Sequence, residues 1–336
     1  MHENLISRIC KLYNLGRLKG DVRAVQGGLI HKMWHIQTTQ GEYAIKELNL
    51  KIQELDSNIS SENSIQKTYE LTESIAQAFL ESGIPAVAAL KAGNEYVSKI
   101  ADKLVIVFEW VEGTILPVQA VSKGQAFLIG KTLAKIHKTN LVVPDLNTNS
   151  LPTFSSGHWG TLFEKFLGKF PESGSWLSKE LVLDWNKKAK DIIQTLERHL
   201  IVSHGDIDQK NVIWKDSMHP FIIDWESAGQ VNPGLELMDA ALNWGGLVSG
   251  DVDEGSTKAF LDGYKSEGIE IIESGEDLLS ACIIKWLPWL EFNMQRAVNL
   301  DNDSEEQRLG FSQTQNTLRN LELIEKNFSG WASFLS

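Results

Sequence analysis

The alternation of apolar and polar residues predicts that the first part of the chain is rich in β-structure. Residues 21–48 contain three runs of β-branched and aromatic residues, separated by turn signals at residues 27–28 and 40–41. An amphipathic helix is expected before them, over residues 3–15, because apolar side chains recur there at helical spacing. The pattern therefore predicts a helix followed by a three-stranded unit.

A long helix and a further strand are expected next. The helix runs from residue 56 or 57 to about residue 82, where Gly83-Ile84-Pro85 ends it. The apolar run at residues 104–107 is typical of a buried strand. After this strand the β-pattern stops at Gly113, so we place the boundary between two lobes at residues 112 and 113.

The second lobe, residues 113–336, is mainly helical in pattern. Helical spacing is clear over residues 124–138 and again from about 177 to 198. The stretch 139–180 is rich in Pro, Gly, Ser and Asn, but it carries too many aromatic residues for a disordered linker. We expect it to be an insertion that packs on the helical lobe. The fold class predicted is α+β.

Composition excludes several classes of protein. Of the 336 residues, 42% are hydrophobic and 23% are charged, as in globular proteins with a sizeable core. No apolar run is long enough to span a bilayer, and the N-terminal residues lack a signal-peptide pattern, so we expect a cytoplasmic protein without a membrane partner. The net charge of −12 argues against nucleic acid as a partner. Cys10 and Cys282 are expected to be reduced core thiols.

Two short apolar runs near the middle of the helical lobe predict a hairpin that carries chemistry. They are residues 212–214 and 221–223, joined by a polar connection that ends in proline. If Val212 faces Ile223, the residues just outside the ladder, Asn211 and Asp224, lie beside each other and offer two oxygen ligands. Asp206 lies on the loop that leads into the same hairpin. Oxygen ligands of this kind suit Mg²⁺ together with phosphate.

These residues resemble a known family. His204-Gly205-Asp206, with Asn211 five residues after Asp206 and then Ile-Asp-Trp-Glu at residues 223–226, resemble the catalytic loop and metal-binding segment of the aminoglycoside phosphotransferase and choline kinase family. These are small-molecule kinases with a protein-kinase-like fold. The resemblance implies a small β-rich lobe with one long helix and a larger, mainly helical lobe.

The resemblance also implies roles for the loop and hairpin. Asp206 would orient the acceptor hydroxyl and take its proton, while Asn211 and Asp224 would hold Mg²⁺ against the phosphates of ATP or GTP. Further possible site residues are His204, Asp208, Lys210 and Glu226. His204 would be structural. Relatives often carry a basic residue where this chain has Asp208, so charge neutralisation from that position is lost or comes from Lys210.

In the first lobe, the resemblance assigns the residues that hold the nucleotide. Gly27 and Gly28 would cover the phosphates, and Lys46, which strand alternation places on one face with Ala44, would pair with them. A glutamate on the long helix would orient the lysine. The candidates are Glu62, Glu70 and Glu73, and the spacing to the Gly-x-Pro segment selects Glu73. The backbone of Glu109 and Val111 would bind the purine.

The acceptor is expected to be a small molecule, because the chain passes almost directly from Glu226 into a helix near Pro233, which leaves no segment to dock a peptide. Residues 1–112 carry 12 basic against 14 acidic residues, and residues 113–336 carry 20 against 30. This acid excess favours a cationic acceptor such as an aminoglycoside or another basic antibiotic.

Two alternatives stay open. One is a kinase for a metabolite of the choline, homoserine or sugar-derivative type, and the other is a non-catalytic kinase-like protein. The joint presence of Lys46, Asp206, Asn211 and Asp224 argues against the second alternative. The pattern is compatible with a monomer or a dimer.

Overall fold

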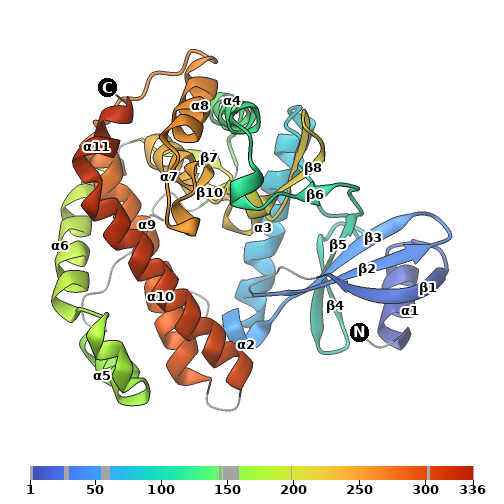
Figure 1. Cartoon of the computed structure of the whole chain (residues 1–336). Coiled ribbons are helices and arrows are strands. Elements are labelled where there is room, and N and C mark those ends of the chain that lie inside the picture. The colour runs from blue at the N-terminus through green and yellow to red at the C-terminus, as the bar shows by residue number, and fades with distance from the viewer. Residues whose placement is uncertain are drawn as a thin grey trace. The chain divides into compact units, whose positions relative to one another are not determined.

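The protein is described by a computed structural model that covers residues 3–25, 30–53, 61–143, 146, 159–197, 199–300 and 303–335. These residues form two compact units (Figure 1). The first unit comprises residues 1–115 and 210–228, and the second comprises residues 116–209 and 229–336. The first run ends close to the boundary expected at residues 112 and 113. The inclusion of residues 210–228 in the first unit is a feature that the sequence pattern did not indicate.

The first unit is built around a five-stranded antiparallel sheet. In spatial order its strands are β1 (Leu18–Val25), β2 (Lys32–Thr38), β3 (Glu42–Glu47), β5 (Lys103–Glu109) and β4 (Val97–Ile100). Helix α1 (Glu3–Leu12) packs on one face of the sheet, where Tyr43 and Ile45 of β3 join its apolar residues in one core cluster (Figure 1). The predicted helix and three strands are confirmed.

The long helix α3 (Glu62–Glu81) packs on the other face of this sheet. Its residues Ile65 and Tyr69 share a core cluster with Leu104 and Ile106 of β5. Ser61 caps the helix by accepting a hydrogen bond from the Ser64 N–H. The earlier start expected at residue 56 or 57 lies outside the described residues. A short helix, α2 (Leu50–Gln53), follows the third strand.

A small sheet completes the first unit and explains why residues 210–228 belong to it. Strands β6 (Thr114–Ile115), β8 (Val212–Asp216) and β9 (His219–Ile222) form this sheet in that order. Ile222 exchanges backbone hydrogen bonds of 2.8 Å with the segment after α3, through the Pro85 carbonyl and the Val87 N–H. The ring of Trp225 stacks on Phe79 of α3, with centroids 5.3 Å apart. The hairpin is therefore fixed to the helix that lies behind Lys46.

The second unit is mainly helical. Its helices are α4 (Lys123–Thr139), α5 (Trp159–Lys169), α6 (Lys179–Leu196), α7 (Pro233–Gly245), α8 (Glu254–Lys265), α9 (Gly275–Asn299), α10 (Ser304–Lys326) and α11 (Phe328–Ala332). Two short strands, β7 (Ile201–Ser203) and β10 (Gly229–Val231), pair antiparallel. Within the described part of the chain, no helix has both the length and the apolar character needed to cross a membrane.

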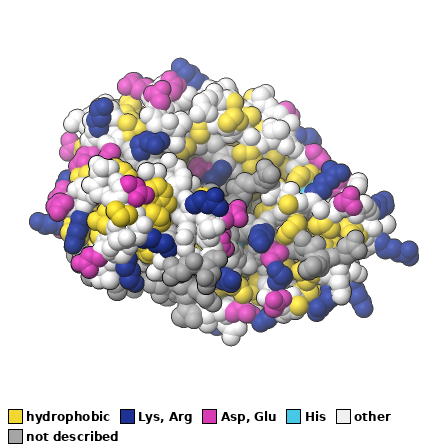
Figure 2. All heavy atoms as spheres, turned by 60° about the horizontal axis from the view of Figure 1, so that its bottom comes forward, with side chains coloured by type: hydrophobic (Ala, Val, Ile, Leu, Met, Phe, Trp, Pro, Cys, Tyr) yellow, Lys and Arg dark blue, Asp and Glu magenta, His cyan; other side chains and the backbone are white. Residues whose placement is uncertain are grey.

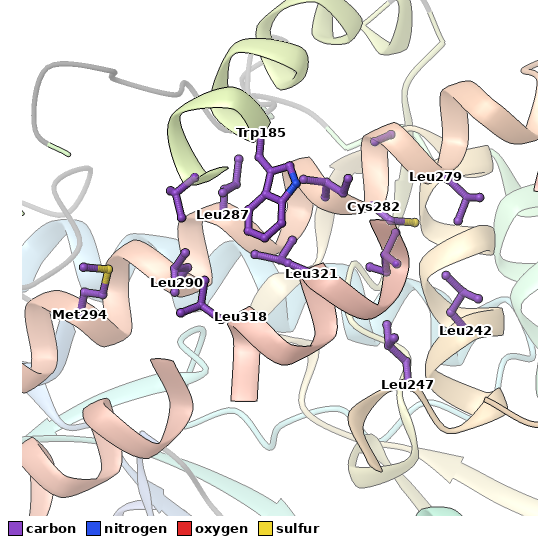
Figure 3. Close-up of a cluster of buried hydrophobic side chains, with 14 of the residues drawn as sticks. Trp185, Leu242, Leu247, Leu279, Cys282, Leu287, Leu290, Met294, Leu318 and Leu321 are labelled. Atoms are coloured by element: carbon purple, nitrogen blue, oxygen red, sulfur yellow. The ribbon is translucent and has the colours of Figure 1, made fainter. Parts of the chain in front are cut away.

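One large apolar core holds the second unit together. Trp185 of α6 lies between residues of α9 and α10, among them Leu287 and Leu321, and all three side chains are fully buried (Figure 3). The described part of the aromatic stretch 139–180 contributes Trp159, Phe163 and Phe166 of α5 to this core. The expectation that this stretch packs on the helical part agrees with these contacts.

Candidate active site

Lys46 is the centre of the charged residues in the first unit. Its Nζ lies 2.6 Å from Asp224 Oδ1 and 2.7 Å from Glu226 Oε2. Burial alone would lower the pKa of Lys46, but the charges of the two carboxylates raise it well above its ordinary value. Lys46 is therefore a buried cation. Its ion pairs join strand β3 to the Asp-Trp-Glu segment, which begins 178 residues later in the sequence.

The register of the hairpin places Asp224 differently from the expected pairing. Val212 pairs with Ile222, not with Ile223, so Asn211 lies opposite Ile223 and accepts its N–H at 2.9 Å. The strands extend to a tighter turn than expected, because the Asp216 carboxylate accepts hydrogen bonds from the Met218 and His219 N–H groups. Asp216 still pairs with His219 in the expected register, and a bulge between residues 214 and 216 then shifts the remaining pairs by one residue.

Asp224 leaves the ladder immediately after this point. Its backbone is in the left-handed region, with φ 61° and ψ 60°, a conformation that aspartate tolerates better than most residues. Its side chain is 34% exposed, and a 3₁₀ turn at Trp225–Ser227 follows. This turn is what lets Asp224 and Glu226 both reach Lys46.

The donor set on this turn fits a hard divalent cation. Asp224 and Glu226 supply carboxylate oxygens, both within 2.7 Å of Lys46 Nζ, and Mg²⁺ is usually held by one or two carboxylates together with substrate phosphates. The residues that the structure describes contain no group of three or more His, Cys, Asp or Glu side chains arranged to hold a metal by themselves.

His31 and Tyr69 contact the carboxylate of Glu226, and the sequence analysis did not predict either contact. The Nδ1 atom of His31 accepts the Asn49 N–H at 3.1 Å, so a neutral His31 carries its proton on Nε2, which lies 2.6 Å from the Tyr69 hydroxyl and 3.3 Å from Glu226 Oε2. The Tyr69 hydroxyl donates to Glu226 at 3.2 Å. Burial would raise the pKa of Glu226, but the Lys46 charge and the His31 hydrogen bond hold it far below its ordinary value.

Glu73 does not form the expected ion pair with Lys46. It is buried on α3, and its carboxylate accepts the Ala89 N–H at 3.2 Å. Burial raises the pKa of Glu73 to about 8, although the nearby Lys46 charge and the Ala89 hydrogen bond oppose the shift. The carboxylates that Lys46 contacts are those of Asp224 and Glu226.

The two rival glutamates on α3 have other structural partners. Glu70 accepts the backbone N–H groups of Tyr96 and Val97 at 3.0 and 2.7 Å, which fixes the start of β4. Glu62 pairs with Lys99 in a half-exposed position. Both therefore act at the far edge of the sheet and not at Lys46.

Glu109 and Val111, the residues predicted to bind the purine through their backbone, lie at and just after the end of β5. The Val107 carbonyl accepts the Leu90 N–H at 2.7 Å. Because alternate residues of a strand direct their backbone groups to the same side, Glu109 points its carbonyl to the edge beyond Leu90. The Val111 N–H has no hydrogen-bond partner among the described residues. Gly27 and Gly28, the other predicted nucleotide contacts, lie outside the described residues.

The second unit contains Asp206, on a loop fixed by a buried carboxylate. Gly205, with φ 80°, donates its N–H to Glu236 Oε1 of α7 at 2.6 Å. His204 is fully buried, and its Nδ1 accepts the Asp206 N–H at 3.2 Å. The structural role expected for His204 is consistent with this bond.

Glu236 is in turn held by α4 and α8. His137 Nε2 lies 2.8 Å from Glu236 Oε2, and His137 Nδ1 lies 2.7 Å from the Tyr264 hydroxyl. Burial would raise the pKa of Glu236, but the hydrogen bond from His137 and its charge bring it below the ordinary value. The buried, ionised carboxylate of Glu236 thus accepts a hydrogen bond from the backbone of the Asp206 loop.

Helix α7 also holds the far end of the loop. Trp244 donates its indole N–H to the Ile207 carbonyl at 2.8 Å, and the Gln209 side chain donates to the Asn243 carbonyl. Asp208 is buried and Lys210, in the first unit, is exposed. The loop is therefore anchored on both sides of Asp206.

Helix α9 contributes a cation that sequence reasoning missed. Lys285 Nζ lies 2.5 Å from Asp239 Oδ2 of α7. A signal was present, since Lys285 is the sole charged residue in the sequence between Asp277 and Glu291. Such a lysine in an apolar helix is expected to have a specific partner.

A five-stranded sheet with one long helix, and a separate helical unit that carries the Asp206 loop, define the protein-kinase-like class of fold. The phosphotransferase enzyme family matches residues 21–268. The chain belongs to this family, and it is a small-molecule kinase, a phosphotransferase that acts on hydroxyl groups. A comparison with curated proteins gave no match.

Several solved structures have a similar fold. An amicoumacin kinase in complex with AMP-PNP, Ca²⁺ and its antibiotic has a TM-score of 0.65 and 14% identity, over 97% of this chain and 94% of that chain. A spectinomycin phosphotransferase in complex with ADP and spectinomycin has a TM-score of 0.64 and 13% identity, over 95% of this chain and 98% of that chain. The choline kinase of Streptococcus pneumoniae has a TM-score of 0.62 and 16% identity, over 95% of this chain and 99% of that chain. At these identities the likeness shows the fold.

Proposed function

We propose that the protein transfers the γ-phosphate of Mg²⁺-bound ATP or GTP to a hydroxyl of a small molecule. The observation that carries this proposal is the convergence of Lys46 on Asp224 and Glu226 at 2.6 and 2.7 Å. Phosphoryl transfer depends on positioning and on charge stabilisation, for which a buried cation next to oxygen ligands is suited. Complexes of two similar folds with ADP and with AMP-PNP support a nucleotide donor.

Each residue then has a role that its own chemistry allows. Lys46 pairs with the phosphates, and Asp224 and Asn211 hold the metal, which neutralises phosphate charge when it is bound. Glu109 and Val111 offer their backbone to the purine, and Gly27 and Gly28 cover the phosphates. Asp206, on a loop whose backbone is held by Glu236, orients the acceptor hydroxyl and takes its proton.

We propose an amine-bearing acceptor, and an aminoglycoside or other basic antibiotic is the first class to test. The acid excess of residues 113–336 supports it, and similar folds act on spectinomycin and amicoumacin. The similar choline kinase also supports the second candidate, a metabolite kinase. Basic and acidic side chains are interspersed over the face shown in Figure 2.

The test is a screen for acceptor-dependent release of nucleoside diphosphate. Purified protein is incubated with Mg²⁺ and ATP or GTP and with aminoglycosides, other basic antibiotics, amino alcohols, hydroxy amino acids and sugars. We expect at least one acceptor to stimulate release in the wild type and not in the Asp206→Ala variant. A protein that binds neither nucleotide by calorimetry, and that releases no diphosphate with any acceptor, would be a non-catalytic kinase-like protein and would overturn the proposal.

A further inference from the structure

In the ion pair between Lys285 and Asp239, the lysine side chain is partly exposed to solvent and the aspartate side chain is buried. The Asp239 side chain is 3% exposed, and its two oxygens already accept hydrogen bonds from the Lys285 ammonium, the Trp286 indole at 3.1 Å and the Asn243 amide at 3.3 Å. The Lys285 side chain is 29% exposed, and Asp239 is its one hydrogen-bond partner among the described residues. An ammonium has three donors, so two remain for a ligand.

The position of this pair on α7 places it beside the loop of Asp206. Glu236, Asp239 and Asn243 follow one another at helical spacing, so they lie on one face of α7. The residues at both ends of this row bond to the loop, through the Gly205 N–H and the Gln209 side chain. Asp239, and with it Lys285, lies between Glu236 and Asn243, which bonds to Gln209 through its backbone carbonyl, and so between the two points at which α7 holds the loop. The charge of Asp206 is also among those that raise the pKa of Lys285, after that of Asp239 and against the effect of burial.

We propose that Lys285 is a specificity-determining residue that binds a carboxylate of the acceptor, close to the hydroxyl that is phosphorylated. The inference rests on the proposed function and narrows it to acceptors that carry a carboxylate in addition to a hydroxyl and an amine, which turns the choice from aminoglycosides toward zwitterionic acceptors. An accessible ammonium beside Asp206 attracts an oxyanion by a charge-assisted hydrogen bond. It also repels an acceptor ammonium from the same side, so a purely cationic acceptor is disfavoured there.

The test uses acceptor pairs that differ by one carboxylate. L-Homoserine is compared with 3-aminopropan-1-ol, and L-serine with 2-aminoethanol, by kcat/KM at saturating Mg-ATP. We expect the wild type to prefer the carboxylate-bearing member of at least one pair by about tenfold or more. In the Lys285→Met variant, kcat/KM for the carboxylate-bearing acceptor should fall on the order of 10- to 100-fold, so that the preference disappears. The fall should come mostly from a higher KM for that acceptor, with KM for ATP unchanged. Lys285→Arg should retain the preference.

Two further variants keep the test independent of folding. Lys285→Met leaves Asp239 buried without its counter-charge, so a second variant combines it with Asp239→Asn and removes both charges. Lys188→Met is the matched control, because Lys188 pairs with Asp184 on α6 at 2.8 Å in an exposed position of the same unit. It should behave as the wild type.

The outcomes separate this inference from the proposed function. Turnover of amino alcohols or aminoglycosides with no preference for a carboxylate, or equal losses for both members of a pair in the Lys285 variants, would overturn the role of Lys285 and leave a small-molecule kinase. The absence of turnover with every acceptor, carboxylate-bearing or not, would overturn both.

Discussion

The charged residues of the first unit and the Asp206 loop of the second unit are held in place by different kinds of interaction. Lys46 is fixed by side-chain ion pairs to Asp224 and Glu226, whose side chains are 34% and 24% exposed. The Asp206 loop is fixed by its backbone, which donates to the buried carboxylate of Glu236 and accepts from the indole of Trp244. The ion pairs of Lys46 can be exchanged for other charged partners. The backbone hydrogen bonds of the Asp206 loop cannot be exchanged without unfolding part of the loop.

This difference suits the two tasks. Phosphate and metal carry charge, so they can take over ion pairs that partly exposed carboxylates make with a lysine. A proton acceptor has to be held within a few tenths of an ångström, which backbone hydrogen bonds to a buried helix provide. Substitutions in the first unit should therefore change nucleotide affinity, and substitutions around the loop should change turnover.

The largest effect is expected for Asp206→Ala. If Asp206 is the base that we propose, its removal should lower kcat on the order of a thousandfold, within the range measured for general bases. Nucleotide affinity should stay within about twofold, since Lys46, Asn211 and Asp224 are untouched. Diphosphate release and calorimetry measure the two quantities. Turnover within tenfold of the wild type would show that Asp206 is not the base.

The next effect is expected for Asp224→Ala, which acts on binding. Loss of this carboxylate removes the proposed metal ligand and one of the two partners of Lys46, so Mg²⁺-dependent nucleotide affinity should fall on the order of 10- to 100-fold. Calorimetry with ATP in the presence and absence of Mg²⁺ measures it. Glu62→Gln, which removes an exposed ion pair to Lys99 at the far edge of the sheet, is the control. An unchanged affinity would exclude Asp224 as the metal ligand.

The sequence predicted the parts of the site that depend on local pattern. Strand alternation placed Lys46 and Tyr43 on opposite faces, and the structure agrees, because Tyr43 packs with α1 while Lys46 lies by Tyr69 of α3. The His-Gly-Asp motif and the Asp-Trp-Glu motif led to the family that the comparison with known families confirms.

The features that sequence reasoning missed depend on tertiary contacts. The hairpin register shifted by one residue because a bulge lies between Trp214 and Asp216. The partner of Lys46 was assigned to Glu73 from spacing along α3, but spacing along one helix cannot show that Glu226, 180 residues away, reaches the same lysine. Lys285 was missed for the same reason, since its partner Asp239 lies on another helix.

A smaller effect on turnover is expected for Glu236→Gln, which tests the backbone anchoring of the loop. Glutamine keeps the size of the side chain but accepts the Gly205 N–H less strongly, and it can no longer pair with His137 as an anion. We expect kcat to fall about tenfold and stability to fall by about 1–3 kcal/mol, with nucleotide affinity preserved. Steady-state kinetics and denaturant unfolding measure both. A loss of nucleotide affinity in place of kcat would contradict the division between the two units.

The pH dependence of Glu236 follows from its lowered pKa. The folded state holds the carboxylate ionised at pH values where the unfolded chain has begun to bind a proton, so its contribution to stability is present above the ordinary pKa of glutamate. That contribution is lost as the pH falls through the folded pKa. The Glu236→Gln variant should therefore lose less stability than the wild type on acidification below about pH 5.

The smallest effect is expected for Glu73→Gln, and it concerns stability, not activity. Because burial raises the pKa of Glu73 to about 8, the folded state keeps a proton that the unfolded chain releases near pH 4.5. Stability from this group is therefore complete below about pH 4.5 and declines as the pH rises through 8. Between pH 6 and pH 8 the wild type should lose on the order of 2 kcal/mol more than Glu73→Gln. Denaturant unfolding at the two pH values measures this, and parallel curves for the two proteins would mean that Glu73 is ionised, as an orienting partner of Lys46 would be.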